Sequence, residues 1–350
     1  MTKRIVFVIG AGASKEVNMP VGEELKENIS RLLDIRYEGG FRLESGDFNI
    51  SEALKIHTKN IGRDNSAYNN YLKESRRISK ALTLAISIDN YIDSQRGNEE
   101  IELCSKLAIV KAILESEGKS LLANYNSRGN GLDFKKLKNT WYLPFFKLLT
   151  ENCTKEDLKD RFKNVTLVIF NYDRCVEQFL YYALQQYYDV NVLETYEILE
   201  QLEIYHPYGD VGLLLNRAGE NLGYGGNPAP DKLLELSKRI KTFTEGVDPE
   251  SSDIKEIREK TGLANKLVFL GFAYHKINME LIKPYITTSG GINPECYGTT
   301  YNISLQDQSV IKNELSEYFD IHDSYVSLSL PTVTCKDFFN EFWRSLAFDV

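Results

Sequence analysis

The sequence predicts an α/β fold in which a parallel β-sheet is covered by helices on both faces and is interrupted by a mostly helical insertion. Three short apolar runs indicate buried strands, at residues 5–9 (IVFVI), 165–170 (VTLVIF) and 266–272 (KLVFLGF). Continuous apolar runs of this length are typical of parallel strands that are buried on both faces. A helical pattern follows each run, and this alternation favours right-handed crossovers within one parallel sheet.

The N-terminal part of the chain begins with the strand at 5–9, which ends at a glycine. A helix is expected over 21–35, where leucine and isoleucine recur at helical spacing. From about residue 37 to about residue 162 the apolar residues recur every three or four positions, and β-branched runs are few. We therefore expect residues 37–162 to form a helical insertion subdomain, and residues 1–36 and 163–350 to form a Rossmann-like sheet domain.

The C-terminal half returns to the alternating pattern. A helix is expected directly after the strand at 165–170, and a short strand and a turn are expected within 203–212. Residues 216–231 are rich in Gly, Asn and Pro, which predicts a loop. The remaining expected elements are helices at 232–243, 252–262, 277–286, 309–319 and 335–348, and strands at 266–272, 299–305 and 323–330.

Composition disfavours several classes of function. The 350 residues carry a formal net charge of −8, whereas proteins that grip duplex DNA usually carry a basic excess, so no direct nucleic-acid binding is expected. No run approaches the ~20 apolar residues that span a bilayer, so no membrane partner is expected. The cysteines form no Cys-x-x-Cys pair, which predicts reduced thiols in a cytoplasmic protein and neither a zinc ribbon nor a disulfide framework: Cys104, Cys153, Cys175, Cys296 and Cys335.

The ends of the predicted strands direct attention to a ligand site, because ligands in open α/β sheets bind outside the carboxyl ends of the strands. The first strand ends in Gly10-Ala11-Gly12-Ala13-Ser14. Such glycines let the backbone turn tightly, and the turn is expected to aim N–H groups and a helix N-terminus at one point that attracts phosphate. A plain strand-to-helix turn is the alternative. The full Gly-x-Gly-x-x-Gly fingerprint and the usual ribose-binding acid are both missing, which disfavours an ordinary dehydrogenase.

Polar residues at the other strand ends are candidate catalytic groups. Asn171 and Asp173 stand where the second strand leaves the sheet, although Asp173 also suits the cap of the following helix. His206 precedes a Pro-Tyr-Gly turn, where a histidine can be a general base or a hydrogen-bonded structural residue. Gly271 is expected to let a backbone segment pass close to a nucleotide, and His275 follows on the turn into a helix, where it can also be a turn or cap residue.

Four short motifs, in this order, resemble the sirtuin-like domain of bacterial NAD-degrading antiphage defence proteins: GAGAS (10–14), FNYD (170–173), YHPYG (205–209) and FLGFAYHKIN (269–278). The segment ISIDNYI at 86–92 also resembles a helical signature of the bacterial branch. The resemblance covers about residues 4–282. The residues that match the broader sirtuin pattern are Gly10, Ala11, Gly12, Ser14, Asn171, Asp173, His206 and Gly209.

The resemblance implies an NAD⁺ glycohydrolase that releases nicotinamide, leaves ADP-ribose and needs no metal. It implies that Asn171 orients the attacking water or the ribose and that His206 accepts a proton. It also implies that Asp173 fixes the local geometry or holds a ribose hydroxyl. The residues expected to bind NAD⁺ are Gly10, Ala11, Gly12, Ala13, Ser14, Pro20, Asp89, Gly209, Gly271 and His275.

The resemblance also implies a restraint on turnover, because cells do not tolerate constant NAD loss. We expect the trigger in trans, from a partner such as a hexameric ATPase of the same defence system or from self-assembly into a homo-oligomer. The helical insertion and the helix at 335–348 are candidate contact surfaces. In the helix at 335–348, the apolar anchors of such a contact would be Phe338, Phe339, Phe342 and Trp343. The alternative for this last helix is packing on the chain's own sheet.

Other functions stay open on the sequence alone. The same pocket suits a regulatory module that binds NAD or ADP-ribose without turning it over. It also suits a transferase that ADP-ribosylates a protein or deacylates a lysine, and a largely structural subunit is a further alternative. Deacetylase sirtuins carry a zinc ribbon and a Gln before the Asn, whereas this chain has no paired cysteines and has Phe170 at that position, which disfavours deacylation.

Overall fold

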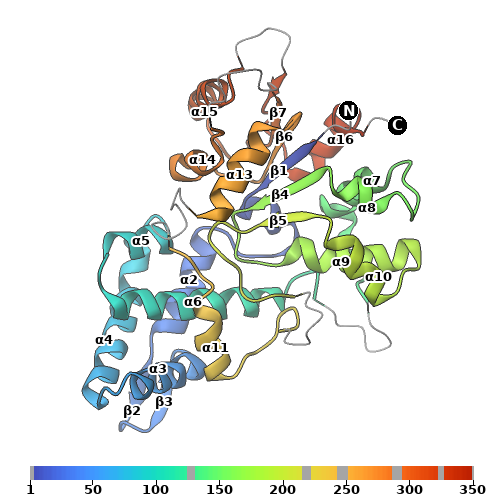
Figure 1. Ribbon diagram of the computed structural model, residues 1–350. Coiled ribbons are helices and arrows are strands. Elements are labelled where there is room, and N and C mark those ends of the chain that lie inside the picture. The colour runs from blue at the N-terminus through green and yellow to red at the C-terminus, as the bar shows by residue number, and fades with distance from the viewer. Residues whose placement is uncertain are drawn as a thin grey trace.

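A single parallel sheet forms the centre of the computed structural model, which describes residues 4–123, 131–214, 222–242, 251–285, 294–321 and 327–348. Its strand order is β5-β4-β1-β6-β7-β8, and every pairing in it is parallel (Figure 1). Helices lie on both faces, so the predicted α/β fold of the Rossmann type is confirmed. The strands are β1 (Ile5–Ile9), β4 (Val165–Ile169), β5 (Glu203–Tyr205), β6 (Lys266–Leu270), β7 (Glu295–Gly298) and β8 (Leu328–Ser329).

The three predicted buried strands form the middle of this sheet. All residues of β1, β4 and β6 are buried, as continuous apolar runs require. β1 pairs with β4 from Ile5 opposite Val165 to Ile9 opposite Ile169, and Ile9 also lies opposite Leu270 of β6. The order reverses at β1, because β4 and β5 follow on one side of it while β6, β7 and β8 follow on the other. Sheets of this kind bind ligands at that switch point, outside the carboxyl ends of the strands.

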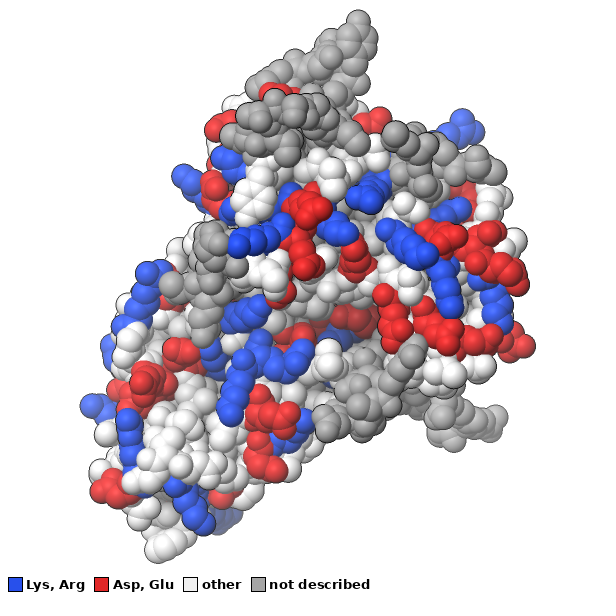
Figure 2. Space-filling model, in the orientation of Figure 1, with Lys and Arg blue, Asp and Glu red and all other residues white. Residues whose placement is uncertain are grey.

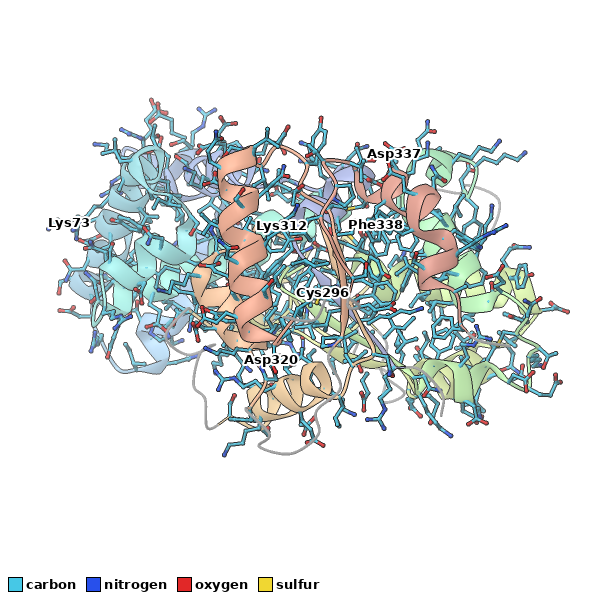
Figure 3. The ribbon with its side chains drawn as sticks, turned by 90° about the horizontal axis from the view of Figure 1, so that it is seen from above. Lys73, Cys296, Lys312, Asp320, Asp337 and Phe338 are labelled. Atoms are coloured by element: carbon cyan, nitrogen blue, oxygen red, sulfur yellow. The ribbon has the colours of Figure 1, made fainter. Side chains whose placement is uncertain are left out.

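Helices and short 3₁₀ turns make the connections between the strands. Seen from above, α15 and α16 lie on opposite sides of the strand that carries Cys296 (Figure 3). The described 3₁₀ turns are η1 (Lys15–Val17), η2 (Leu82–Leu84) and η3 (Lys136–Asn139). The described helices are α1 (Ala11–Ser14), α2 (Glu23–Leu33), α3 (Phe48–Asn60), α4 (Asn65–Ala81), α5 (Ile88–Ser94), α6 (Glu99–Glu117), α7 (Tyr142–Thr150), α8 (Leu158–Phe162), α9 (Cys175–Tyr188), α10 (Val192–Leu199), α11 (Pro230–Ser237), α13 (Ser252–Gly262), α14 (Lys276–Ile282), α15 (Leu305–Tyr318) and α16 (Cys335–Leu346).

The segment between β1 and β4 combines an outlying helical group with helices that pack on the sheet. A small antiparallel hairpin, β2 (Arg36–Glu38) with β3 (Arg42–Ser45), precedes α3, and α3, α4 and α6 pack on one another and on α2 or α11. Figure 1 shows α3, α4 and the hairpin at the end of the molecule away from the sheet. α7 instead contacts β1, with the Phe7 and Phe145 ring centroids 5.2 Å apart. The predicted boundaries of the insertion subdomain, at residues 37 and 162, stay a prediction.

The last helix packs into the chain's own core. Phe338 and Phe339 of α16 are completely buried. The Phe339 ring stacks on Trp141 with centroids 6.2 Å apart, and the Phe338 ring stacks on Phe342 at 4.8 Å. These two phenylalanines are therefore occupied within the chain, and the hypothesis that they anchor a partner is wrong.

The strand predicted at 299–305 is a turn, and the strand of this region lies earlier, at β7. The chain reverses at Asn302, whose φ is 62°, and the Ile303 N–H donates to the Thr300 carbonyl at 3.0 Å. The Ser304 side chain then caps α15 by accepting the Asp307 N–H. The alternation of polar and apolar residues that suggested a strand instead reflects polar side chains in a turn and at a helix cap. At 323–330, β8 comprises Leu328–Ser329, and residues 322–326 lie outside the described residues.

One carboxylate joins the turn after β1 to two helices, and replacing it is expected to destabilise the fold. Glu16 accepts the backbone N–H of Trp141 at 2.7 Å, before α7, and that of Lys336 at 3.0 Å, in α16. Glu16→Gln keeps one acceptor and turns an N–H₂ group toward the other donor. We expect the free energy of unfolding to fall by about 1–3 kcal/mol in urea denaturation. Glu27→Gln, on the exposed side of α2, is the matched control, and equal losses in the two variants would contradict this role.

Candidate active site

Four of the predicted site residues follow four neighbouring strands. Gly10, His206 and Gly271 come directly after β1, β5 and β6, and Asn171 follows β4 with one residue between them. Because these strands are parallel and adjacent in the order β5-β4-β1-β6, their carboxyl ends meet at one edge of the sheet. Segments far apart in the chain therefore come together at the edge where Rossmann-type sheets bind ligands.

The glycine turn packs closely against the turn that follows β6. A Cβ on Gly10 would lie 2.6 Å from the Gly271 carbonyl oxygen, and one on Gly12 would lie 2.8 Å from the same atom. Gly271 has a φ of +54°, and a Cβ there would lie 2.0 Å from the Ala13 nitrogen. Packing alone thus requires glycine at these three positions. Ala11 and Gly12 are nevertheless exposed, so the outer side of the turn is open to a ligand.

The turn presents fewer N–H groups to a phosphate than its sequence predicts. The N–H groups of Gly10, Gly12 and Ala13 donate to backbone oxygens of Leu270, Gly271 and Gly10, at distances between 2.9 and 3.0 Å. The helix that starts in the turn, α1, has four residues, and the longer α2 begins only after a 3₁₀ turn. A helix N-terminus does lie in the turn, as expected, but it belongs to the four-residue α1. The expectation that the turn aims its N–H groups at a ligand is wrong for Gly10, Gly12 and Ala13.

The Asn171 side chain lies at the centre of this edge and has one atom without a partner. Its Nδ2 donates to the Gly10 carbonyl at 3.2 Å and to the Ser14 hydroxyl at 3.0 Å. A carbonyl oxygen can only accept, which fixes the orientation of the amide. Asn171 is 6% exposed, and no donor from the described residues reaches its Oδ1. Because an unpaired buried acceptor costs stability, this oxygen points to a ligand or a water molecule that donates to it.

His206 faces oxygen atoms through both of its ring nitrogens. Nδ1 lies 3.0 Å from the Asn171 carbonyl oxygen, and Nε2 lies 2.9 Å from Oε1 of Glu177. Burial alone would lower the pKa of His206, but the hydrogen bond and charge of Glu177, reinforced by Asp210, raise it to about 9. The ring is therefore charged at neutral pH in this arrangement, whereas a general base needs an unprotonated ring nitrogen.

Asp173 supports the edge from beneath. Its carboxylate accepts the backbone N–H of Cys175, the first residue of α9, at 3.1 Å, although the N-cap position of this helix is Arg174 rather than Asp173. Burial raises the pKa of Asp173, while hydrogen bonds from Cys175 and Ser14 lower it. Ser14 thus connects the Asn171 amide to the Asp173 carboxylate.

Asp89 reaches the same edge from the helical segment. Its carboxylate accepts a hydrogen bond from the hydroxyl of Tyr172, the residue after Asn171. Burial raises the pKa of Asp89, and this hydrogen bond lowers it. Tyr208, in the turn after β5, donates to Oδ1 of Asn278 at 2.7 Å and so joins that turn to α14.

The other three predicted residues have different surroundings. Gly209 has a φ of +80°, and a Cβ there would lie 1.8 Å from the Arg239 carbonyl oxygen, so packing requires this glycine. Pro20 is half-buried before α2, and His275 is exposed at the start of α14, where its side chain makes no cap hydrogen bond. Within the described ranges no hydrogen bond joins Pro20 or His275 to the groups at the sheet edge.

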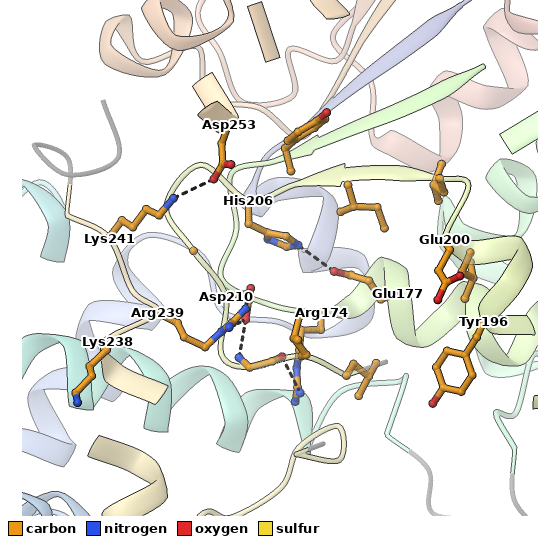
Figure 4. Close-up of a pocket in the computed structure, with 18 residues that line it drawn as sticks. Arg174, Glu177, Tyr196, Glu200, His206, Asp210, Lys238, Arg239, Lys241 and Asp253 are labelled. Carbon is orange, nitrogen blue, oxygen red and sulfur yellow. Dashed lines mark hydrogen bonds and ion pairs between the residues drawn. The ribbon is translucent and has the colours of Figure 1, made fainter. Parts of the chain in front are cut away.

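A cleft of about 750 Å³ opens on the β5 side of His206 (Figure 4). Two ion pairs line it: Asp210 pairs with Arg239 at 2.6 Å, and Asp253 pairs with Lys241 at 3.2 Å. Of the predicted residues, His206 and Gly209 line this cleft, whereas the glycine turn and Asn171 do not. The charged residues that line it are Arg174, Glu177, Glu200, Asp210, Lys238, Arg239, Lys241 and Asp253.

Sequence reasoning missed two acidic residues beside the edge. Glu177, in the first turn of α9, contacts His206, and Glu117, at the end of α6, forms a buried ion pair with Arg174. An acidic residue in the first turn of a helix is favourable in any amphipathic helix, so the sequence marks Glu177 only weakly. Nothing local in α6 signals a partner for Glu117, because Arg174 lies on a distant segment.

No protein-family model matches the chain, and no curated protein matches it either.

In the part of the chain that the structure describes, no group of three His, Cys, Asp or Glu side chains is placed to hold a metal ion. None of the described helices is long and apolar enough to cross a membrane. Figure 2 shows basic and acidic side chains interspersed over the face that it presents.

Proposed function

We propose that the chain is an NAD⁺ glycohydrolase of the sirtuin-like type that its motifs resemble. The observation that supports this proposal most is the unpartnered, buried Oδ1 of Asn171 at the carboxyl edge of a Rossmann-type sheet. The backbone carbonyl oxygen of the same residue lies 3.0 Å from Nδ1 of His206. An acceptor in this place can receive a hydrogen bond from a ribose hydroxyl group or from a water molecule that attacks the ribose.

The proposed reaction adds water to the ribose carbon that holds nicotinamide. The carbon–nitrogen bond breaks, and its electron pair leaves with nicotinamide, which departs neutral because its ring is cationic in NAD⁺. The water gives up one proton, and the product is ADP-ribose. The transition state resembles an oxocarbenium ion, as in glycoside cleavage, so the site has to orient the ribose and the water rather than protonate the leaving group.

Each residue of the edge has a place in this proposal. Asn171 accepts a hydrogen bond from the ribose or the water through Oδ1, while Nδ2 stays bonded to the turn after β1. His206 accepts a proton when its ring is neutral, and Asp173 keeps the turn and the start of α9 in register. The diphosphate lies over the exposed backbone of Ala11 and Gly12.

Purified protein incubated with NAD⁺ is expected to release nicotinamide and ADP-ribose in equal amounts, measured by liquid chromatography. A series of protein concentrations shows whether the rate per molecule rises with self-assembly. Nicotinamide release without free ADP-ribose would instead indicate transfer to an acceptor. Absence of release at every concentration, with or without candidate partner proteins, would contradict the proposal.

The second candidate is a module that binds NAD or ADP-ribose without turnover. The observation that favours it is the His206 ring, because both nitrogens are engaged and neither is available as a proton acceptor. Calorimetric binding of ADP-ribose by a chain that never releases nicotinamide would support this candidate over hydrolysis.

We also propose that turnover is restrained until a trigger acts. A constitutively active NAD⁺ hydrolase depletes the cell's own NAD, and the occupied His206 ring describes a resting state. Self-assembly into a homo-oligomer, or a partner such as a hexameric ATPase of a defence system against phage, would supply the trigger.

A further inference from the structure

The contact between Glu177 and His206 joins two elements of the site that are distant in the sequence. Glu177 is the third residue of α9, and His206 is the first residue after β5. Oε1 of Glu177 lies 2.9 Å from Nε2 of His206, and the two side chains are 16% and 10% exposed. The second carboxylate oxygen of Glu177 is buried and has no partner among the described residues. The carboxylate is thus committed to the histidine through one oxygen.

The partners of the ring determine its protonation state. The Asn171 carbonyl oxygen near Nδ1 has no hydrogen to donate, so Nδ1 must carry one. Nε2 lies 2.9 Å from Oε1 of Glu177, and this contact helps raise the pKa of His206 to about 9, so Nε2 also carries a hydrogen at neutral pH. A ring with two N–H groups is an imidazolium ion, and it has no lone pair with which to accept a proton from substrate.

Other charged groups face this pair from the neighbouring elements. Asp210, in the turn after β5, acts on His206 and is paired with Arg239, which follows α11. Arg174, at the start of α9, acts on Glu177 but is itself bound to Glu117 of α6. Lys241 and Asp253, which also line the cleft, pair with each other. Glu177 is the carboxylate in direct contact with the ring.

We propose that Glu177 is a positioning residue that holds His206 as an imidazolium ion in the resting protein, so that His206 becomes a proton acceptor only when this ion pair separates. The catalytic role of this ion pair rests on the proposed NAD⁺ hydrolysis, whereas the existence of the ion pair does not depend on that proposal. When the pair opens, the Nε2 proton passes to the carboxylate or to water, and Nε2 gains a lone pair. A substrate hydroxyl or the attacking water then takes the place of Oε1 and delivers its proton to Nε2.

The pair also makes stability depend on pH in a defined direction. The folded-state pKa of His206, about 9, lies above its ordinary value of 6.5. The stability that the pair contributes is therefore fully present below pH 6.5 and is lost as the pH rises through about 9. The Glu177→Gln variant is expected to lose this slope, because its amide can donate to a neutral ring without a charge.

Proton NMR titration tests the ion pair directly, because the chain has four histidines and the His206 ring signal can be assigned by its absence in His206→Gln. In the wild-type protein the His206 ring is expected to titrate near pH 9, and in Glu177→Gln it is expected to titrate about two pH units lower. Glu200→Gln, which removes an equal charge from the same cleft, is expected to leave the titration near its wild-type value. A wild-type titration near pH 6.5, or one that Glu177→Gln leaves unchanged, would overturn the proposal.

The pH profile of NAD⁺ cleavage supplies the second measurement. At pH 7 the neutral fraction of the ring is roughly 1% for a pKa of 9 and about three quarters for a pKa of 6.5. Glu177→Gln is therefore expected to raise kcat at pH 7 by more than about 10-fold, with KM little changed, and to move the acidic limb of the profile to lower pH. If the NMR titrations behave as expected while no variant cleaves NAD⁺, the proposed function fails and the ion pair stands. If NAD⁺ is cleaved while the titrations do not shift, the proposed function stands and the proposed role of the ion pair fails.

Discussion

Replacing Asn171 or His206 by alanine is expected to lower kcat for NAD⁺ cleavage by at least about 100-fold. Asn171 offers the unpaired acceptor of the site, and without it a water or ribose hydroxyl loses the group that orients it. His206 offers the ring that removes the proton, and loss of a general base typically costs 10²–10⁴-fold. Rates of nicotinamide release under single-turnover conditions measure the chemical step apart from product release.

The controls for this prediction separate chemistry from folding. Asn171→Ala also removes one of the two donors to the Gly10 carbonyl, which keeps the Ala13 N–H, and this is expected to cost about 0.5–1.5 kcal/mol of stability. Activity is therefore compared at a temperature where circular dichroism shows both variants to be folded. Asn90→Ala and His57→Ala replace the same residue types on α5 and α3 and are expected to retain wild-type rates. Turnover retained in both site variants would remove the assignment of the sheet edge as the catalytic site.

The sequence was sufficient to predict the centre of the fold. A parallel strand covered on both faces must be apolar at every position, and β1, β4 and β6 are such runs in the sequence as well as in the structure. The carboxyl ends of these strands then had to meet, which brings Gly10, Asn171 and Gly271 together. Local patterns sufficed here because one constraint, a parallel sheet covered by helices on both faces, determines the burial of the strands, their direction and the edge at which ligands bind.

Interactions between distant segments could not be predicted in the same way. The spacing of Gly10 and Gly12 predicts a phosphate-binding turn, yet both glycines pack against the backbone of Gly271, which only the folded chain brings close. Glu177 has the same local sequence features as any acidic residue in an amphipathic helix, and its contact with His206 depends on how α9 returns to the sheet beside β5. The strand predicted at 299–305 is also wrong, because Thr, Asn and Ser favour turns and helix caps as well as strands.

The buried ion pair between Glu117 and Arg174 is expected to give the largest loss of stability for a single charge change. Arg174 donates to Oε2 of Glu117 at 2.5 Å and to Oε1 at 3.0 Å, and it also donates to the carbonyl oxygen of Leu222 at 2.7 Å. The Gly225 N–H donates to the same carboxylate at 2.9 Å. Both side chains are at most 2% exposed. Glu117→Gln leaves a guanidinium ion buried without its counter-charge, which is expected to lower the free energy of unfolding by about 3–5 kcal/mol.

Chemical denaturation of a matched pair of variants tests whether burial causes this loss. Glu197→Gln breaks the surface ion pair between Glu197 and Lys159, whose side chains are 43% and 48% exposed. This variant is expected to lower the free energy of unfolding by no more than about 0.5 kcal/mol. Arg174→Met combined with Glu117→Gln is expected to cost less than the sum of the two single variants, because the double variant no longer buries an unpaired charge. A loss within about 1 kcal/mol for Glu117→Gln would contradict the role of the pair.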